Sequence, residues 1–184
     1  MGRQQPNGRA ALRSRTAWTA VLACALAMTA LVTSAATAYA LLGHAAPDFA
    51  LHAVNGHNVR LSEHRGNVVV LSFWGSRCGQ CRMQLAALDK SFKTYHSAGL
   101  QVFGVNVDDD QGGALEFART QALGFPLLLD PKKAVARSYL VDNLPMTLLI
   151  DRSGAVRQVH RDFSSKFEPS PLGCQCRQTA PCGK

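Results

Sequence analysis

Long apolar runs in the middle of the chain alternate with segments of helical periodicity. One almost unbroken run covers residues 67–73 and a second covers 100–107. Runs of this kind are typical of central strands in a parallel sheet, which are buried on both faces. Between them, apolar residues recur at the spacing of an amphipathic helix. These residues are Met83, Leu85, Leu88, Phe92 and Tyr95.

Shorter apolar runs on either side complete the pattern. The dipeptide Asn55-Gly56 is a strong hairpin signal, and it separates two short strand-like runs. The shorter predicted strands cover residues 49–51, 59–61, 125–129, 147–150 and 156–160, and further helices are expected from near 113 and over 134–139. Alternating strands and helices followed by an antiparallel pair predict an α/β fold with a mainly parallel central sheet.

The first 42 residues have a different composition. Four arginines precede residue 16, and no charged residue occurs between Ala17 and Leu42. This run is long enough to span a bilayer, for which about 20 apolar residues suffice. It ends in Ala38-Tyr39-Ala40, a pattern that signal peptidase accepts. We therefore expect 1–42 to be either a signal peptide cleaved near Ala40 or an N-terminal membrane anchor.

The positive charge before the apolar run predicts that the rest of the chain lies outside the cytoplasm, on the periplasmic or cell-surface side. Residues 43–163 are expected to form one domain, and 164–184 a cysteine-bearing tail that is loop or disordered. Without the four N-terminal arginines, the formal charge of +8 falls to +4. The remaining charges are scattered and not interleaved with aromatic residues, so nucleic-acid binding is not expected.

The main chemical motif is Cys78-Gly79-Gln80-Cys81, which follows a buried strand and opens a helix. In this context a C-x-x-C motif indicates redox chemistry. Free N–H groups and the dipole at a helix start stabilise a thiolate, which lowers the thiol pKa below its ordinary value of about 8.5. We expect Cys78 to be the exposed nucleophile and Cys81 the resolving thiol, one turn inward. The disulfide itself carries the electrons, so no further cofactor is expected.

Neighbouring residues are expected to tune this pair. Arg77 and Arg82 flank it, and a guanidinium close to Cys78 would stabilise the thiolate and make the couple more oxidising. Gly79 and Gln80 separate the two cysteines, and Trp74 is expected to pack beside them.

Three further cysteines, Cys174, Cys176 and Cys182, lie in the tail. If the tail folds back, they could complete a zinc or copper site with Cys78 and Cys81, because a closed site needs more than two ligands and thiolates select these metals. An internal redox relay and a structural disulfide are the other interpretations of the tail cysteines. A metal-handling protein is therefore the alternative function.

Several segments taken together resemble the TlpA/ResA-type branch of the thioredoxin superfamily, which belongs with the AhpC/TSA redoxins. The resemblance covers about residues 45–160. It rests on Pro47-Asp48-Phe49, residues 71–81 and 104–108, Phe125-Pro126 with Asp130, and residues 144–151 with Gly154. It implies a thioredoxin-like fold, in which a central mixed β-sheet is flanked by helices, preceded by an N-terminal hydrophobic segment.

The resemblance also implies a function and partners. Proteins of this branch exchange disulfides with client proteins and keep chosen extracytoplasmic thiols reduced. Typical clients are cytochrome c maturation factors and copper-site assembly proteins, and electrons come from a membrane thiol transporter of the CcdA/DsbD kind. Leu144-Pro145 matches the cis-proline of the family, where the backbone next to Pro145 pairs with the client. A thiol peroxidase is a third possibility, although the Pro-x-x-x-Thr-x-x-Cys arrangement of peroxiredoxins is absent around Cys78.

The chain departs from the family at four positions. Arg77 and Gln80 replace the usual tryptophan before the first cysteine and the proline before the second. Ser72 replaces a buried acid, and Gln84 replaces a glutamate. Both of the usual proton acceptors for the resolving thiol are therefore missing. Since a positioned base typically contributes about 10²–10⁴-fold in rate, we expect water to serve instead, client release to be slow, or a different step to be favoured.

Overall fold

The computed structural model describes Gly2 and residues 37–163. The tail and almost all of the predicted leader therefore lie outside the described residues. Among residues 37–163, no helix is both long and apolar enough to cross a membrane. The elements in chain order are η1 (Ala38–Leu41), β1 (Ala50–Ala53), β2 (Asn58–Arg60), η2 (Leu61–His64), β3 (Val68–Trp74), α2 (Gly79–Tyr95), η3 (His96–Ala98), β4 (Leu100–Asn106), α3 (Gly112–Thr120), β5 (Leu127–Leu129), α4 (Ala134–Ser138), β6 (Met146–Ile150) and β7 (Val156–His160).

The strands form one mixed sheet in the order β2-β1-β5-β4-β3-β6-β7. Strand β3 pairs in parallel with β4, and β4 pairs in parallel with β5, while all the other pairings are antiparallel. The two long apolar runs of the sequence are thus the central strands β3 and β4, as predicted. The hairpin β1–β2 turns through Gly56, whose φ of +86° is a conformation that glycine adopts at no steric cost.

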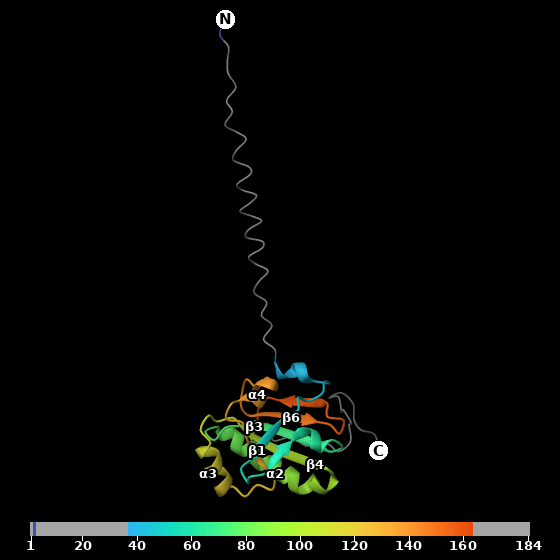
Figure 1. Cartoon of the computed structure of the whole chain (residues 1–184), viewed down its shortest axis with the longest axis vertical. Helices are drawn as coiled ribbons and strands as arrows, with labels where there is room; N and C mark the ends of the chain where they lie inside the picture. Colours follow the sequence, from blue (N-terminus) through green and yellow to red (C-terminus); the bar gives the residue numbers. More distant parts are fainter. Residues whose placement is uncertain (1, 3–36, 164–184) are drawn as a thin grey trace, which may run out of the picture. The chain divides into compact units, whose positions relative to one another are not determined.

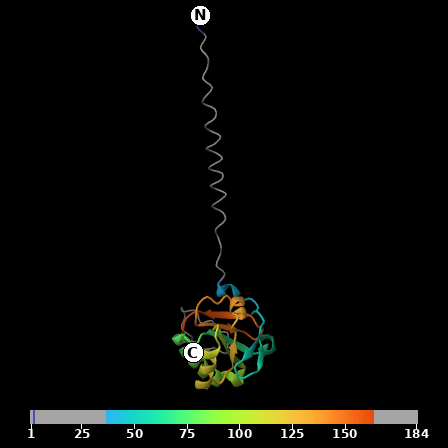
Figure 2. The same ribbon diagram turned by 60° about the vertical axis from the view of Figure 1, so that its left-hand side comes forward.

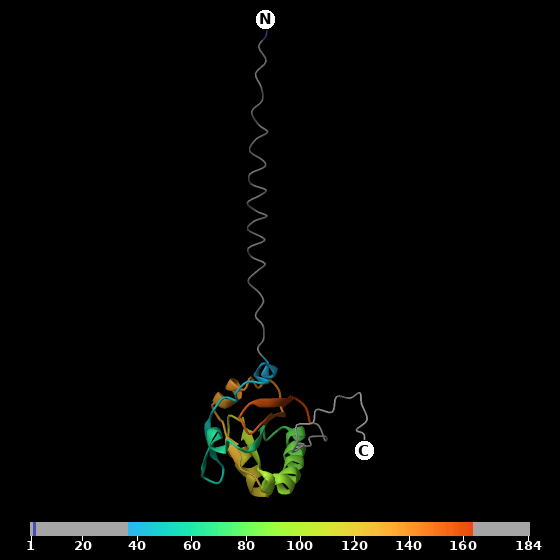
Figure 3. The same ribbon diagram turned by 90° about the vertical axis from the view of Figure 1, so that its right-hand side faces the viewer.

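Each face of the sheet carries its own hydrophobic core, because side chains alternate along a strand. From β3, Val69, Leu71 and Phe73 contribute to one core, whereas Val70 and Trp74 contribute to the other. The first core contains residues of η1, η2 and α4, and the second contains residues of α2 and α3. Helices therefore flank the sheet on both faces, as expected. Figure 1 shows the arrangement of the elements. In Figure 2, η1 and α4 lie on the same side of the sheet. In Figure 3, α2 and α4 lie on opposite sides of the sheet.

Helix α2 buries Cys81, Gln84, Leu85 and Leu88 against the sheet. Met83, which the apolar pattern places with this face, is instead 51% exposed. The reason is geometric: successive helical residues are about 100° apart, so Met83 lies about 200° from Leu85 and faces solvent. The buried face brings the first turn of α2 over the end of β3, where the C-x-x-C motif lies.

Candidate active site

Cys78 and Cys81 form a disulfide at the start of α2, with their Cα atoms 5.2 Å apart. Cys78 is the N-cap residue, and its extended backbone (φ −89°, ψ 105°) leads from the loop into the helix. The backbone N–H of Cys81 donates to Cys78 Sγ across 3.1 Å. Because this N–H belongs to the first turn, which lacks intrahelical acceptors, it is free to stabilise negative charge on that sulfur.

The two cysteines differ in exposure. Cys81 is completely buried in the core beneath α2 and α3, whereas Cys78 is partly exposed. Gly79 and Gln80 between them are both exposed. A dissolved reagent can therefore reach Cys78 but not Cys81, which is the division expected for a nucleophile and a resolving thiol.

The loop before β6 contains a cis peptide bond between Leu144 and Pro145, as the resemblance implies. Pro145 is buried, and the half-buried Leu144 contacts both hydrophobic cores. The N–H of Leu144 donates to Asn143 Oδ1 at 2.9 Å. Within residues 37–163 nothing donates to the Leu144 carbonyl oxygen. The Leu144 carbonyl is thus free of any intramolecular hydrogen bond within the described residues.

Two open clefts share the loop that precedes Cys78. The larger, of about 930 Å³, extends from Arg77 to the cis-proline loop at Leu144. The smaller, of about 500 Å³, lies between Arg77 and α3 and is also lined by Arg82. Both clefts are lined by Ser76 and Arg77, the two residues before Cys78. The surface around the loop before Cys78 is therefore hollowed.

The two arginines around the motif have partners within the protein. The Arg82 guanidinium donates to the backbone carbonyl of Ser76 at 2.9 Å. Arg77 acts electrostatically on Asp108, a residue that follows β4. Trp74 packs its ring against Phe117 of α3, with centroids 4.8 Å apart, and is completely buried.

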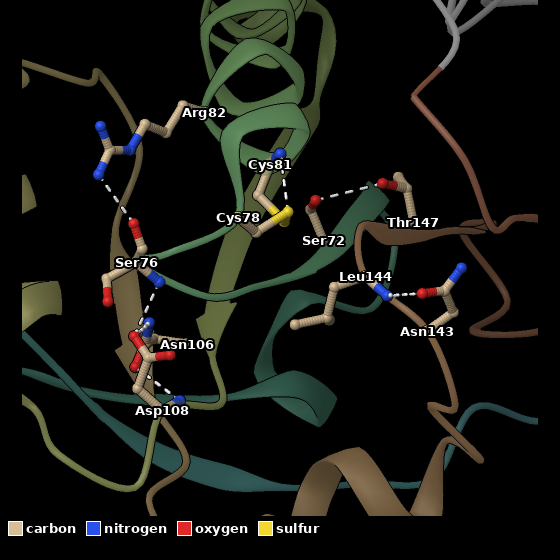
Figure 4. Close-up of a disulfide and its surroundings, with 10 residues drawn as sticks. All are labelled: Ser72, Ser76, Cys78, Cys81, Arg82, Asn106, Asp108, Asn143, Leu144 and Thr147. Atoms are coloured by element: carbon tan, nitrogen blue, oxygen red, sulfur yellow. Dashed lines mark hydrogen bonds between the residues drawn. A yellow bond between two sulfur atoms is a disulfide. The ribbon is translucent and has the colours of Figure 1, made fainter.

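Ser72 and Thr147 occupy neighbouring positions on β3 and β6, beneath the motif. Their hydroxyl oxygens lie 3.2 Å apart and form a hydrogen bond, and both residues are almost completely buried. Strand alternation places both on the same face as α2, and Figure 4 shows them beside the disulfide. Gln84 is also buried, and its Oε1 has no hydrogen-bond partner among the described residues. A hydroxyl pair and an amide, neither of which is a base at neutral pH, therefore occupy the positions of the two family carboxyls.

The Ser72–Thr147 pair predicts non-additive effects on stability. Ser72→Ala or Thr147→Val alone should lower the free energy of unfolding by about 1–3 kcal/mol, because each leaves a buried hydroxyl without its partner. The double variant should lose less free energy of unfolding than the two single variants added together, since no buried hydroxyl is left without a partner. Urea unfolding of the four proteins measures the coupling, and the exposed Thr120→Val serves as a control with little effect. The prediction would be contradicted if the double variant lost as much free energy of unfolding as the two single variants together.

The described residues contain no cluster of three or more histidine, cysteine or acidic side chains that could hold a metal ion. Cys174, Cys176 and Cys182 lie outside residues 37–163, so the predicted metal site with the tail stays a prediction.

A helix-capping disulfide beside a cis-proline on a mixed sheet is a specific combination, and sequence comparison relates it to known proteins. The sequence pattern described as the AhpC/TSA family matches residues 42–159, which is more than half of the chain. The chain belongs to the AhpC/TSA family. Among curated members related to it, thiol-disulfide oxidoreductase ResA of Geobacillus kaustophilus is 36% identical over 113 residues, which are 61% of this chain and 65% of that protein. The thioredoxin-like protein YneN of Bacillus subtilis is 33% identical over 125 residues, covering 66% of this chain and 72% of YneN.

Solved structures give the same picture of this AhpC/TSA member. A protein of Chlorobium tepidum, described as a thiol:disulfide interchange protein DsbE, superposes with a TM-score of 0.64 and 39% identity, covering 67% of this chain and 86% of that one. The exposed lipoprotein thioredoxin Etrx1 of Streptococcus pneumoniae gives a TM-score of 0.58 and 27% identity, covering 64% and 91%. The fold is thioredoxin-like, as the sequence motifs implied. The chain spans about 65% of the length of the ResA proteins that it matches.

Two residues of the AhpC/TSA site were not expected from the sequence. Asp108 begins the acidic run Asp108-Asp109-Asp110, but its carboxylate is partly buried and bonded to the loop before Cys78. Asn106, which is almost completely buried, also contacts Asp108. The sequence held a signal for both residues, because Asn106 ends β4 and Asp108 follows it. Strand β4 is a parallel neighbour of β3, and the carboxyl ends of parallel strands meet at one edge of the sheet.

Proposed function

We propose that this protein is a thiol–disulfide oxidoreductase that acts outside the cytoplasm and exchanges disulfides with client proteins through Cys78 and Cys81, more as a reductant than as an oxidant. The observation that carries this proposal is the Cys78–Cys81 disulfide at the N-terminus of α2, in the same site as the cis Leu144-Pro145 bond. The names of the ResA relatives support the reaction class.

The proposed reaction needs only the two sulfurs. In the reduced protein, the Cys78 thiolate attacks one sulfur of the client disulfide, and the other client sulfur leaves as a thiolate that takes up a proton. Cys81 then loses its proton and attacks Cys78 Sγ, which breaks the mixed disulfide and releases the second client thiolate. The client gains two electrons and two protons, and Cys78–Cys81 becomes the disulfide.

The Cys81 proton has no adjacent carboxylate at either family position, because these hold Ser72 and Gln84. The hydroxyl pair of Ser72 and Thr147 can pass a proton but cannot keep it. We therefore infer that water is the final proton acceptor and that the second step is the slow one.

The charges near the motif favour the reducing direction. Cationic groups close to a thiolate stabilise the reduced form and make a couple more oxidising. Here the Arg82 guanidinium donates to the Ser76 carbonyl. Arg82 thus has a partner other than Cys78, which limits the extra stabilisation of the Cys78 thiolate.

The location and partners follow from the sequence and belong to the same proposal. The apolar segment 17–42 with its preceding arginines supports export, with the domain either anchored at the membrane or secreted after cleavage near Ala40. Etrx1, a structural relative, is described as an exposed lipoprotein. We propose that electrons arrive from a membrane thiol transporter of the CcdA/DsbD kind, and that cytochrome c or copper-site maturation factors are among the clients.

A redox titration of the full-length chain tests the proposal. Arg77 and Arg82 flank the motif, so trypsin releases residues 78–82 as one peptide, whose alkylated fraction can be read by mass spectrometry in thiol/disulfide buffers. This readout is independent of the other four cysteines. A reduction potential near or below about −270 mV marks a reductant, whereas one near −120 mV marks a strong oxidant and contradicts the proposed direction. Absence of a reversible Cys78–Cys81 disulfide would contradict the function itself.

A further inference from the structure

Asp108, two residues beyond the end of β4, reaches across to the loop that carries Cys78. Its Oδ2 accepts a hydrogen bond from the backbone N–H of Ser76 at 2.8 Å and another from Asn106 Nδ2 at 2.9 Å. Asn106 Oδ1 in turn accepts from the Asp108 N–H at 3.1 Å, so the two side chains hold each other in place. Figure 4 shows this set next to the disulfide.

The loop that Asp108 contacts is only three residues long. It joins Trp74, the last residue of β3, to Cys78, the N-cap of α2. Its middle residue is Ser76, whose N–H is bonded to Asp108 and whose carbonyl is bonded to Arg82. The N–H of Cys78 donates to the carbonyl of Gly75 at 3.1 Å, which closes the turn. Fixing Ser76 therefore fixes the direction in which the chain enters the helix.

The carboxylate that makes these contacts remains ionised in the working pH range. Partial burial alone would raise the pKa of Asp108, but hydrogen bonds from Asn106 and Ser76 and the charge of Arg77 outweigh burial, so the pKa lies below its ordinary value. Hydrogen bonds to an ionised acceptor are stronger than those between neutral groups.

The loop is also closely packed at Gly75. A Cβ atom added at Gly75 would lie 3.1 Å from Asp108 Oδ1 and 3.4 Å from Leu144 Cδ1. The absence of a side chain at Gly75 thus allows the loop to approach both the carboxylate and Leu144.

We infer that Asp108 is a positioning residue of the redox centre: through Ser76 it holds Cys78 at the N-cap, where the N–H of Cys81 reaches its sulfur. This inference rests on the proposed function of Cys78 but goes beyond it, because it assigns the reactivity of the thiol to a residue 30 positions away, just after β4. Without the contact, the loop can rotate and Cys78 leaves the field of the helix N-terminus.

The test measures the reactivity of Cys78 in the full-length chain carrying Cys81→Ser, so that peptide 78–82 contains one thiol. Asp108→Ala should raise the pKa of the Cys78 thiol towards its free value and slow its alkylation by iodoacetamide at pH 7 by about tenfold. Asp108→Asn keeps an acceptor oxygen and should stay within about threefold of the parent. Gly75→Ala, which displaces the loop while retaining the carboxylate, should act in the same direction as Asp108→Ala.

Asp109→Ala is the matched control, since it removes the neighbouring carboxylate, which is exposed and paired with Lys133. It should leave the alkylation rate unchanged. A purely structural role would lower the melting temperature of Asp108→Ala without changing the pH profile of Cys78. Alkylation of Asp108→Ala at the parent rate, or an Asn variant as slow as the Ala variant, would overturn the inference. If Asp108→Ala does not fold, parent-like alkylation of Gly75→Ala overturns it.

The measurement separates this inference from the proposed function. Alkylation of Cys78 needs no client and no second cysteine, so it responds to Asp108 even if the wild-type protein exchanges no disulfide. Failure to reduce a protein disulfide such as that of insulin would count against the proposed function alone.

Discussion

Replacing Cys78 with serine is expected to abolish disulfide exchange, whereas replacing Cys81 with serine should leave the first step intact and trap the client. Cys78 is partly exposed, directly follows the two residues that line both clefts, and its sulfur receives the Cys81 N–H, so it is the one that can attack. Completely buried Cys81 can reach only Cys78. Turbidity of reduced insulin measures exchange, and non-reducing electrophoresis detects the mixed disulfide of Cys81→Ser.

The tail cysteines provide the matched control for this experiment. Serine at Cys174, Cys176 and Cys182 together should leave insulin reduction unchanged if the described site is sufficient. Exchange at the wild-type rate in Cys78→Ser would refute the assignment of the nucleophile. Trapping by Cys78→Ser rather than by Cys81→Ser would reverse the two roles. Loss of activity on removal of the tail cysteines would instead favour the internal relay.

A second large effect is expected at Asp130, where alanine should lower the free energy of unfolding by about 2–4 kcal/mol. The residue follows β5 and is 2% exposed. Its two carboxylate oxygens accept the N–H groups of Ala134 and Ala136, at 2.9 and 2.8 Å, in the first turn of α4. The N-cap residue Lys133 makes no side-chain cap of its own. Both N–H groups would lose their partner in Asp130→Ala. The N–H of buried Ala136 would be left unsatisfied, at about 1–3 kcal/mol, and that of exposed Ala134 would lose its cap, at about 1 kcal/mol.

Urea unfolding measures this loss, and Asp130→Asn should recover part of it because one acceptor oxygen remains. Asp110→Ala is the control: Asp110 accepts a single N–H, that of Gly112, at the start of α3, and it is exposed. Its replacement should change stability by less than about 0.5 kcal/mol. An equally small change in Asp130→Ala would show that α4 forms without this cap. Because α4 precedes the cis-proline loop in the chain, we also expect Asp130→Ala to weaken client binding.

The strands, the main helix and the redox motif could be predicted because their signals are local. The apolar runs of β3 and β4 and the helical spacing in α2 reflect burial, which acts on each segment in the same way wherever the segment lies in the fold. The motif carries its own context, since Cys78 directly follows the strand and opens the helix. Met83 was misplaced because it is itself apolar, although its angular position on the helix excludes it from the core.

The contacts of Asp108, Ser72 and Asp130 could not be predicted in the same way. Asp108 meets Ser76 across 32 residues, and Ser72 meets Thr147 across 75. Such pairs depend on which strands become neighbours and in what register, which periodicity does not encode. Asp130 was recognised by the family resemblance alone, because its function as a cap depends on the carboxylate turning back onto a helix four residues later.

The buried position of Ala38 bears on the order of events during export. Ala38 is completely buried in the core that contains α4, and η1 continues to Leu41, so the bond after Ala40 lies inside a folded element. The next residues are joined to β7 by hydrogen bonds between Gly43 and Val156 and between Val156 and His44. A peptidase that cuts after Ala40 therefore competes with folding for the same residues: cutting first yields a domain that lacks a core residue, and folding first protects the bond.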